Sequence, residues 1–93
     1  MKLRFLPDAF ADIERLHAFL APKNPRAANR VVDIIFAAAM SLRTAPRSGR
    51  PLDHGFRELV ARFGKGGYVL RYRVDEEKDA LIIVRIWHSR ERR

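Results

Sequence analysis

The sequence predicts an α+β fold, in which a helical hairpin packs on one face of a small, mostly antiparallel sheet in the order β-α-α-β-β-β. Two observations predict this arrangement. Apolar residues recur at helical spacing through residues 7–42, and from Phe56 to His88 apolar and polar residues alternate in three short runs, as in half-buried strands. A chain of 93 residues also predicts a single domain over residues 1–93.

The N-terminal segment predicts a strand and a first helix. Residues 2–6 alternate polar and apolar side chains, which predicts a short strand at an edge of the sheet, beside one of the C-terminal strands. Pro7 then begins a helix, and residues 21–25, which contain two prolines, end it. The residues that share the apolar face of this helix are Ala9, Ile13, Leu16 and Leu20.

A second helix is predicted from Pro25 to about Leu42. Asn24 is placed to cap it, and proline is favoured at the first helical position, where its missing N–H costs nothing. The short break between the two helices predicts an antiparallel hairpin. The inner face of the second helix is expected to hold Ala27, Val31, Ile34, Ile35, Ala38 and Leu42.

The second helix also carries an apolar stripe roughly opposite its inner face. Val32, Phe36 and Met40 follow one another at positions i, i+4 and i+8. Two interpretations remain open. The stripe is buried within this chain, against the first helix or the sheet, or it forms a groove wall for an amphipathic segment of a partner, or a contact with a second copy.

A loop and three strands follow. Residues 44–51 contain two prolines and a glycine and are expected to form no regular structure. A glycine turn at residues 64–67 and a charged turn at residues 76–79 separate the strands. The strands are predicted at residues 56–63, 68–75 and 81–88.

Strict alternation along these strands divides their side chains between two faces. The face toward the helices is expected to hold Leu59, Ala61, Phe63, Tyr68, Leu70, Tyr72, Val74, Ile82, Val84 and Ile86. The opposite, open face is expected to hold Glu58, Val60, Arg62, Val69, Arg71, Arg73, Leu81, Ile83, Arg85 and Trp87. The four arginines then cluster beside the tryptophan. Like charges so close destabilise the protein on its own, so the cluster predicts an acidic partner that neutralises it through guanidinium–carboxylate pairs.

Composition limits the classes of function. The formal net charge of +8 favours nucleic acid or an acidic protein as the partner. The chain has no cysteine, which excludes disulfides and zinc–thiolate sites. His17, His54 and His88 lack metal-ligand spacing, so no metal and no cofactor are expected. Because no apolar run is long enough to span a bilayer or to form a signal peptide, we expect a soluble cytoplasmic protein that does not bind a membrane.

Several short motifs occur in a specific order along the chain. They are Ala11-Asp12-Ile13, Asn24-Pro25-Arg26-Ala27-Ala28, Pro46-Arg47-Ser48-Gly49-Arg50-Pro51, Phe56-Arg57-Glu58-Leu59, Tyr68-Val69-Leu70-Arg71-Tyr72-Arg73-Val74 and Ile83-Val84-Arg85-Ile86-Trp87-His88-Ser89-Arg90. In this order, and over essentially the whole length, the chain resembles the RelE/ParE superfamily of toxins from bacterial type II toxin–antitoxin pairs, with the ParE-like branch favoured.

The resemblance implies a toxin that a partner antitoxin holds inactive. RelE-like members cut messenger RNA in the ribosome with basic residues on the open sheet face, often beside a tyrosine, histidine or glutamate near the C-terminal end. ParE-like members lack that set and poison DNA gyrase. In ParE-like pairs the antitoxin is commonly a ribbon-helix-helix protein whose acidic C-terminal segment folds on the toxin. We expect antitoxin contacts, in a hetero-oligomer, at Val32, Phe36, Met40, Arg62, Arg71 and Arg73.

Three hypotheses for the function follow from the resemblance. The favoured one is a ParE-like gyrase inhibitor without catalytic residues, whose target contacts are Arg85, Trp87, Arg90, Arg92 and Arg93. The alternative is a RelE-like, ribosome-dependent endoribonuclease that uses Arg62, Arg71, Arg73, Arg85 and His88. Alternation points His88 toward the helices, so we favour a structural role for this residue. The third hypothesis is an inactive remnant that only binds its antitoxin.

Overall fold

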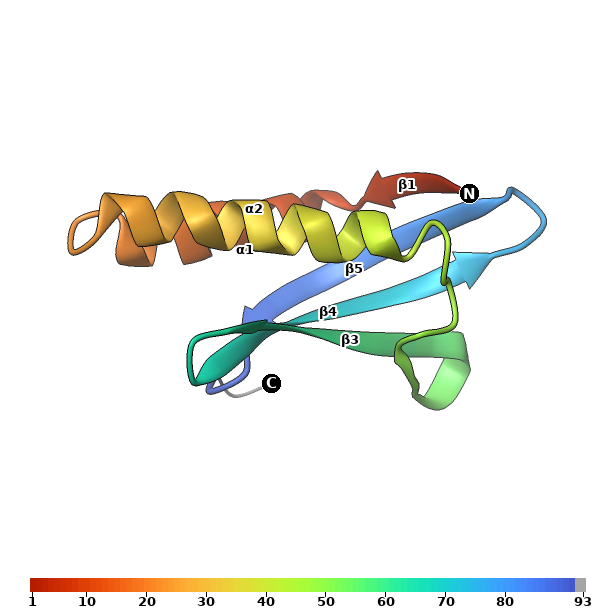
Figure 1. Ribbon diagram of the computed structural model, residues 1–93. Coiled ribbons are helices and arrows are strands. Elements are labelled where there is room, and N and C mark those ends of the chain that lie inside the picture. The colour runs from red at the N-terminus through yellow and green to blue at the C-terminus, as the bar shows by residue number, and fades with distance from the viewer. Residues whose placement is uncertain (92–93) are drawn as a thin grey trace.

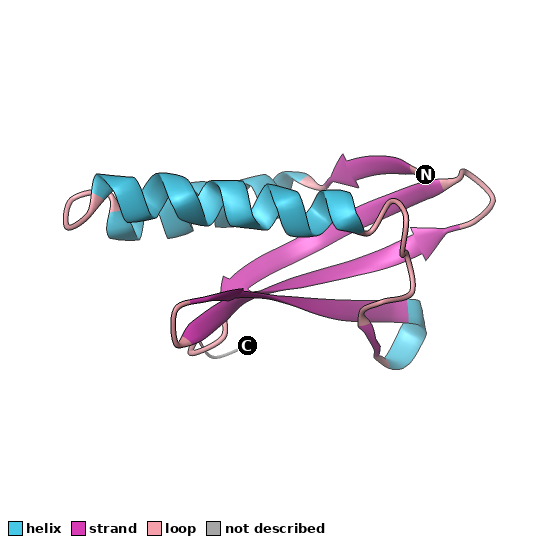
Figure 2. Ribbon diagram, in the orientation of Figure 1, coloured by secondary structure: helices cyan, strands magenta, loops and turns pink. Residues whose placement is uncertain are grey.

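The fold is a five-stranded mixed sheet with two helices on one side. The computed structural model describes residues 1–91. Its elements are β1 (Lys2–Phe5), α1 (Pro7–Leu20), α2 (Pro25–Ser41), β2 (Arg50–Pro51), a 3-10 turn (Asp53–Gly55), β3 (Phe56–Phe63), β4 (Gly66–Asp75) and β5 (Ala80–His88). The strand order is β1-β5-β4-β3-β2, with β1 parallel to β5 and the other neighbours antiparallel. Figure 1 and Figure 2 show both helices on the same side of this sheet, so the predicted α+β fold is confirmed.

The two helices form the predicted hairpin. Pro7 and Pro25 each stand in the first turn of their helix, where proline removes no intrahelical hydrogen bond. The side chain of Asn24 accepts the backbone N–H of Ala27 at 3.1 Å, which confirms it as the cap of α2. Within residues 1–91, neither helix has the length and apolar character needed to cross a membrane.

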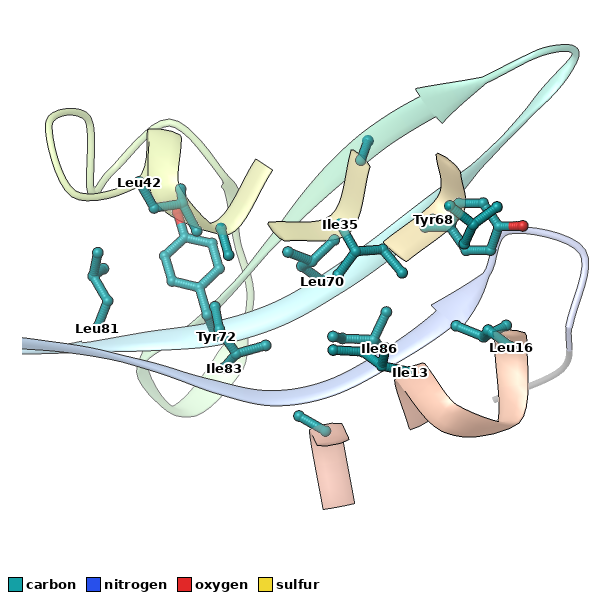
Figure 3. Close-up of a cluster of buried hydrophobic side chains, with 14 residues drawn as sticks. Ile13, Leu16, Ile35, Leu42, Tyr68, Leu70, Tyr72, Leu81, Ile83 and Ile86 are labelled. Carbon is teal, nitrogen blue, oxygen red and sulfur yellow. The ribbon is translucent and has the colours of Figure 1, made fainter. Parts of the chain in front are cut away.

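The core fills the space between the helices and the sheet, as Figure 3 shows. α1 packs mainly on β5, whereas α2 covers β3 and β4. The inner faces predicted for both helices, for β3 and for β4 are confirmed in their central residues. The largest fully buried side chains are Val31, Ile35, Leu42, Leu70, Tyr72, Leu81, Ile83 and Ile86.

The prediction for the first half of β5 is wrong. Arg71 of β4 pairs with Arg85, but the next residue, Tyr72, pairs with Ile83, so Val84 is an extra residue in β5. This β-bulge reverses the alternation on its N-terminal side. Leu81 and Ile83, expected on the open face, are therefore fully buried in the core. Ile82 and Val84, expected in the core, line a groove on the open face instead.

The loop after α2 is also more regular than expected. Arg50 and Pro51 form the short strand β2, which pairs with Glu58 and Arg57 of β3. A proline is tolerated there because β2 is an edge strand, where one N–H is not needed by the sheet. The predicted irregular segment thus contains a strand at its C-terminal end.

Tyr72 anchors this loop from inside the core. Its hydroxyl accepts the backbone N–H of Gly49 at 2.9 Å and donates to the carbonyl of Pro46 at 2.8 Å. A Cβ atom at position 49 would lie 2.6 Å from the Tyr72 ring, so only glycine fits there. The loop backbone is therefore held by one buried phenol.

We predict that Tyr72→Phe destabilises the protein by about 1–3 kcal/mol, because it leaves the buried N–H of Gly49 without an acceptor. The matched control is Tyr68→Phe, since among residues 1–91 it is the hydroxyl of Tyr72, and not that of Tyr68, that bonds to the loop backbone. Urea denaturation at pH 7 checks both variants. Equal losses for the two would contradict the assigned anchor.

Candidate functional site

The open face of the sheet carries three arginines around one groove. Arg71 and Arg85 are direct neighbours on β4 and β5, and Arg73 follows on β4. They surround a hollow of about 500 Å³, which we name the open-face groove. Its apolar floor consists of Leu6, Phe56, Ile82 and Val84. Arg62 lies further along β3, opposite Gly67, and is exposed.

Two of the four arginines are neutralised within the chain. The guanidinium group of Arg71 lies 2.6 Å from a carboxylate oxygen of Glu58 and stacks on the Trp87 ring, 4.9 Å from its centre. That of Arg85 bonds to Asp12. Carboxylates of the chain itself therefore already pair with two of the arginines for which an acidic partner was expected, and that partner stays a prediction.

Arg62 and Arg73 differ from the other two arginines. Among residues 1–91, neither forms an ion pair with a carboxylate. The Arg73 guanidinium lies over the ring of Phe56, 5.4 Å from its centre, and its side chain is exposed. The open face thus presents positive charge that the protein itself does not neutralise.

Asp12 of α1 is the buried polar residue of this region, only 3% exposed. Its carboxylate accepts two hydrogen bonds from Arg85, at 2.9 and 3.1 Å, and one from the backbone N–H of Ile86, at 2.8 Å. β1 pairs with β5 only from Ala80 to Ile83, so within residues 1–91 no strand lies beside this edge of β5 beyond Ile83. Asp12 therefore satisfies a backbone donor at that uncovered edge and an arginine of the open face together.

A second arginine extends the contacts of Asp12 to the C-terminal turn. Arg15 lies 3.4 Å from both the Asp12 carboxylate and the carbonyl of Ile86, and 2.6 Å from Glu91. Glu91 in turn accepts the backbone N–H of His88 at 2.7 Å. Burial raises the pKa of Asp12, but the hydrogen bonds from Arg85 and Ile86 and the arginine charges outweigh it, so this pKa lies below its ordinary value.

His88 lies on the other side of the sheet from the open-face arginines. It lines a separate groove of about 630 Å³ with Tyr68 and the end of α1. Its ring meets that of Tyr68 edge-on, with centres 5.1 Å apart, and its Nδ1 accepts the backbone N–H of Arg90 at 3.0 Å. Burial, and then the charge of Glu91, raises the pKa of Tyr68. The expected orientation and the structural role of His88 both agree with these contacts.

The residues expected to contact the target differ in their exposure. Trp87 is on the open face but only 7% exposed, because Arg71 covers its ring. Arg90 is exposed in the C-terminal turn. Arg92 and Arg93 lie outside the described residues. Within residues 1–91, no group of three histidine, aspartate or glutamate side chains could hold a metal ion.

The apolar stripe of α2 is partly accessible. Val32 is half-buried against the core, but Phe36 and Met40 are 36% and 48% exposed. Phe36 also contacts the ring of Phe5, which in turn meets Phe10 of α1. Burial within the chain therefore accounts for only part of this stripe.

Sequence reasoning missed the roles of Asp12, Ile82 and Val84. Asp12 carried a usable signal, because it stands beside Ile13 and one turn from Ala9 and Leu16, on the apolar face of α1. A carboxylate at such a position needs a buried partner. Ile82 and Val84 carried no signal, since the bulge that exposes them leaves no mark in a run of aliphatic residues.

Comparisons with known proteins agree with this fold. The family described as ParE toxin of type II toxin–antitoxin system, parDE, matches residues 3–93. Toxin RelE3 of Caulobacter vibrioides is 42% identical over 87 residues, which cover 94% of this chain and 92% of that protein. A chromosomal ParDE system from P. aeruginosa has the same fold, with a TM-score of 0.77, 23% identity and 95% of each chain covered. The RelBE2 toxin–antitoxin complex of Mycobacterium tuberculosis matches with a TM-score of 0.62 and 31% identity over 97% of this chain and 92% of that one.

We predict that Asp12→Asn lowers the free energy of unfolding by about 1–3 kcal/mol at pH 7, because a charge-assisted pair is lost. The folded-state pKa of Asp12 is lowered, so its stabilisation is full above the unfolded-state pKa of about 3.9 and is lost as the pH falls toward the folded-state value. The difference between wild type and variant should therefore shrink below pH 4 in urea denaturation. Asp33→Asn, an exposed aspartate of α2, is the control. A difference that stays constant from pH 7 to pH 3 would refute this assignment.

Proposed function

Because this chain belongs to the ParE toxin family of type II toxin–antitoxin systems, we propose that it acts by binding a target and that this target is DNA gyrase. The observation that carries the proposal is the separation of the open-face arginines from His88. Arg71, Arg73 and Arg85 surround the open-face groove, whereas His88 lines the groove on the other side of the sheet.

RNA cleavage makes demands that this separation does not meet. It needs a base for the 2′-hydroxyl and an acid for the leaving oxygen, both close to the positive charge on the phosphate. On the open face, the described acidic side chain is Glu58, and its two oxygens already accept hydrogen bonds from Arg50 and Arg71. Tyr68 is packed against His88 on the opposite side. The face therefore offers charge and apolar surface, which suits binding.

A RelE-like endoribonuclease is the second candidate. The observation that favours it is the 42% identity to a protein named Toxin RelE3. In that case Arg62, Arg71, Arg73 and Arg85 would hold the phosphates of the message, and His88 would have to reach them after a rearrangement in the ribosome. The two candidates predict different damage in cells, so they can be separated by experiment.

We further propose that an antitoxin with an acidic segment neutralises this toxin on its open face. The solved relatives come from ParDE and RelBE toxin–antitoxin systems. The open-face groove combines an apolar floor with a guanidinium rim, which fits a segment that carries both aliphatic and acidic side chains. The exposed Phe36 and Met40 of α2 offer the same partner a second, apolar contact. A ribbon-helix-helix protein with an acidic C-terminal segment has this chemistry.

We predict that the purified toxin inhibits plasmid supercoiling by gyrase. Arg85→Glu should weaken this inhibition, because it reverses a charge at the proposed contact, whereas Arg26→Glu on the exposed start of α2 should not. Normal supercoiling at saturating toxin, together with codon-positioned cuts in primer extension of cellular messenger RNA, would establish the ribonuclease instead. Absence of growth arrest on induction would point to an inactive remnant.

We predict that Arg71→Gln combined with Arg73→Gln weakens antitoxin binding roughly 5–30-fold, since each exposed charge contact contributes up to about 1 kcal/mol. The variant should also flatten the salt dependence of binding, because charges on an exposed face are screened within about 8–10 Å. Isothermal titration at 50 and 300 mM salt measures both effects. The matched control neutralises two exposed cations outside the groove, Arg26 and Lys65. An unchanged salt slope would rule out an electrostatic interface.

A further inference from the structure

We propose that Asp12 is the positioning residue of the toxin's contact surface. It holds Arg85 beside Arg71 on the open face and, through Arg15 and Glu91, ties the C-terminal turn that carries Arg90 to the same helix. This role rests on the proposed function and extends it. Asp12 holds the arginines that contact the target in place before the target binds.

Asp12 fixes the position of Arg85 on the open face. The Cα of Arg85 pairs directly with that of Arg71, so the two guanidinium groups repel each other unless carboxylates lie between or beside them. Asp12 binds Arg85 through both of its oxygens, which fixes the plane of the guanidinium as well as its position. The Arg85 side chain nevertheless remains 41% exposed. Some of its N–H donors therefore stay available to a partner.

Arg15 and Glu91 hold the C-terminal turn against α1. Arg15 reaches Asp12 with one nitrogen and Glu91 with the other, at 3.4 and 2.6 Å. Glu91 accepts the N–H of His88, and the N–H of Glu91 returns to the carbonyl of His88 at 2.9 Å. Arg90 stands inside this closed turn. Its backbone is thus tied to α1 by the ion pair between Arg15 and Glu91, while Asp12 of the same helix contacts the Arg15 guanidinium.

Asp12→Asn separates the positioning role of this residue from its role in folding. The core of α1 depends on Ala9, Ile13 and Leu16, which Asp12→Asn leaves unchanged. An asparagine oxygen can still accept the N–H of Ile86 at the edge of β5. The same oxygen also accepts the Nε–H of Arg85, but the asparagine amide nitrogen then faces the Arg85 and Arg15 nitrogens that the other carboxylate oxygen accepted. The substitution therefore removes the charge and replaces two of the guanidinium hydrogen bonds with a donor–donor contact, while it keeps the backbone contact. A partner must then immobilise these side chains itself on binding, at a cost in affinity.

The test that does not depend on the target is nitrogen-15 relaxation of the Arg85 Nε–H group. Asp12→Asn should lower its order parameter clearly below the wild-type value, toward the range of flexible groups, below about 0.6. Asp33→Asn, which removes the same charge from an exposed site on α2, should leave it unchanged. An Arg85 side chain that stays rigid in Asp12→Asn would overturn the proposal.

The functional test is a double-mutant cycle on gyrase inhibition. Asp12→Asn should raise the half-inhibitory toxin concentration about 3–10-fold, but by a smaller factor in an Arg85→Gln background, where one of the two positioned groups is absent. An equal factor in both backgrounds would show a general loss of fold and would overturn the role of Asp12. If the wild-type toxin does not inhibit gyrase, the proposed target fails, while the relaxation measurement still decides the positioning role.

Glu91→Gln provides a second variant that does not touch the core. It breaks the ion pair between Arg15 and the turn but leaves Asp12 and Arg85 in contact. We expect faster hydrogen exchange at the N–H of Arg90 and unchanged relaxation at Arg85. Unchanged exchange at Arg90 would overturn the link from Asp12 to the C-terminal turn, even if Asp12→Asn failed to fold.

Discussion

The carboxylate of Asp12 is the interaction on which the arrangement of the open face depends. α1 lies along β5 beyond the end of β1. There, within residues 1–91, no strand pairs with this edge of β5. A buried carboxylate there is unfavourable by itself, but it receives a backbone N–H and three guanidinium hydrogen bonds. One residue thus links the helix layer, the sheet edge and the arginine surface.

The charge on the open face is divided into a neutralised part and an available part. Glu58 and Asp12 each hold one arginine of the pair at the centre of β4 and β5, which removes the repulsion between them. Arg73 keeps its charge over the ring of Phe56. A guanidinium has five N–H donors, so an arginine that binds one carboxylate can still bind a second. The surface can therefore be stable alone and still attract an acidic segment or another anionic partner.

Most of the fold could be predicted because its signals are local. Asn24 and Pro25 define the start of α2, and the alternation along β3 and β4 assigns their two faces correctly. The bulge at Val84 could not be predicted, since Leu81, Ile82, Ile83 and Val84 are all aliphatic and either register buries two of them. The register is decided by tertiary contacts, in which Leu81 and Ile83 pack beside Tyr72 (Figure 3). For the same reason the apolar floor of the open-face groove appeared only in the structure, although its arginines were predicted.

The most direct test of this account is a crystal structure of the Asp12→Asn variant. We predict that the helices, the sheet and the hydrogen bond from the N–H of Ile86 to the side chain at position 12 stay in place. The Arg85 guanidinium should lose its fixed position and move away from Arg71. An Arg85 side chain in its original place, with the same neighbours, would contradict the claim that the charge of Asp12 organises this surface.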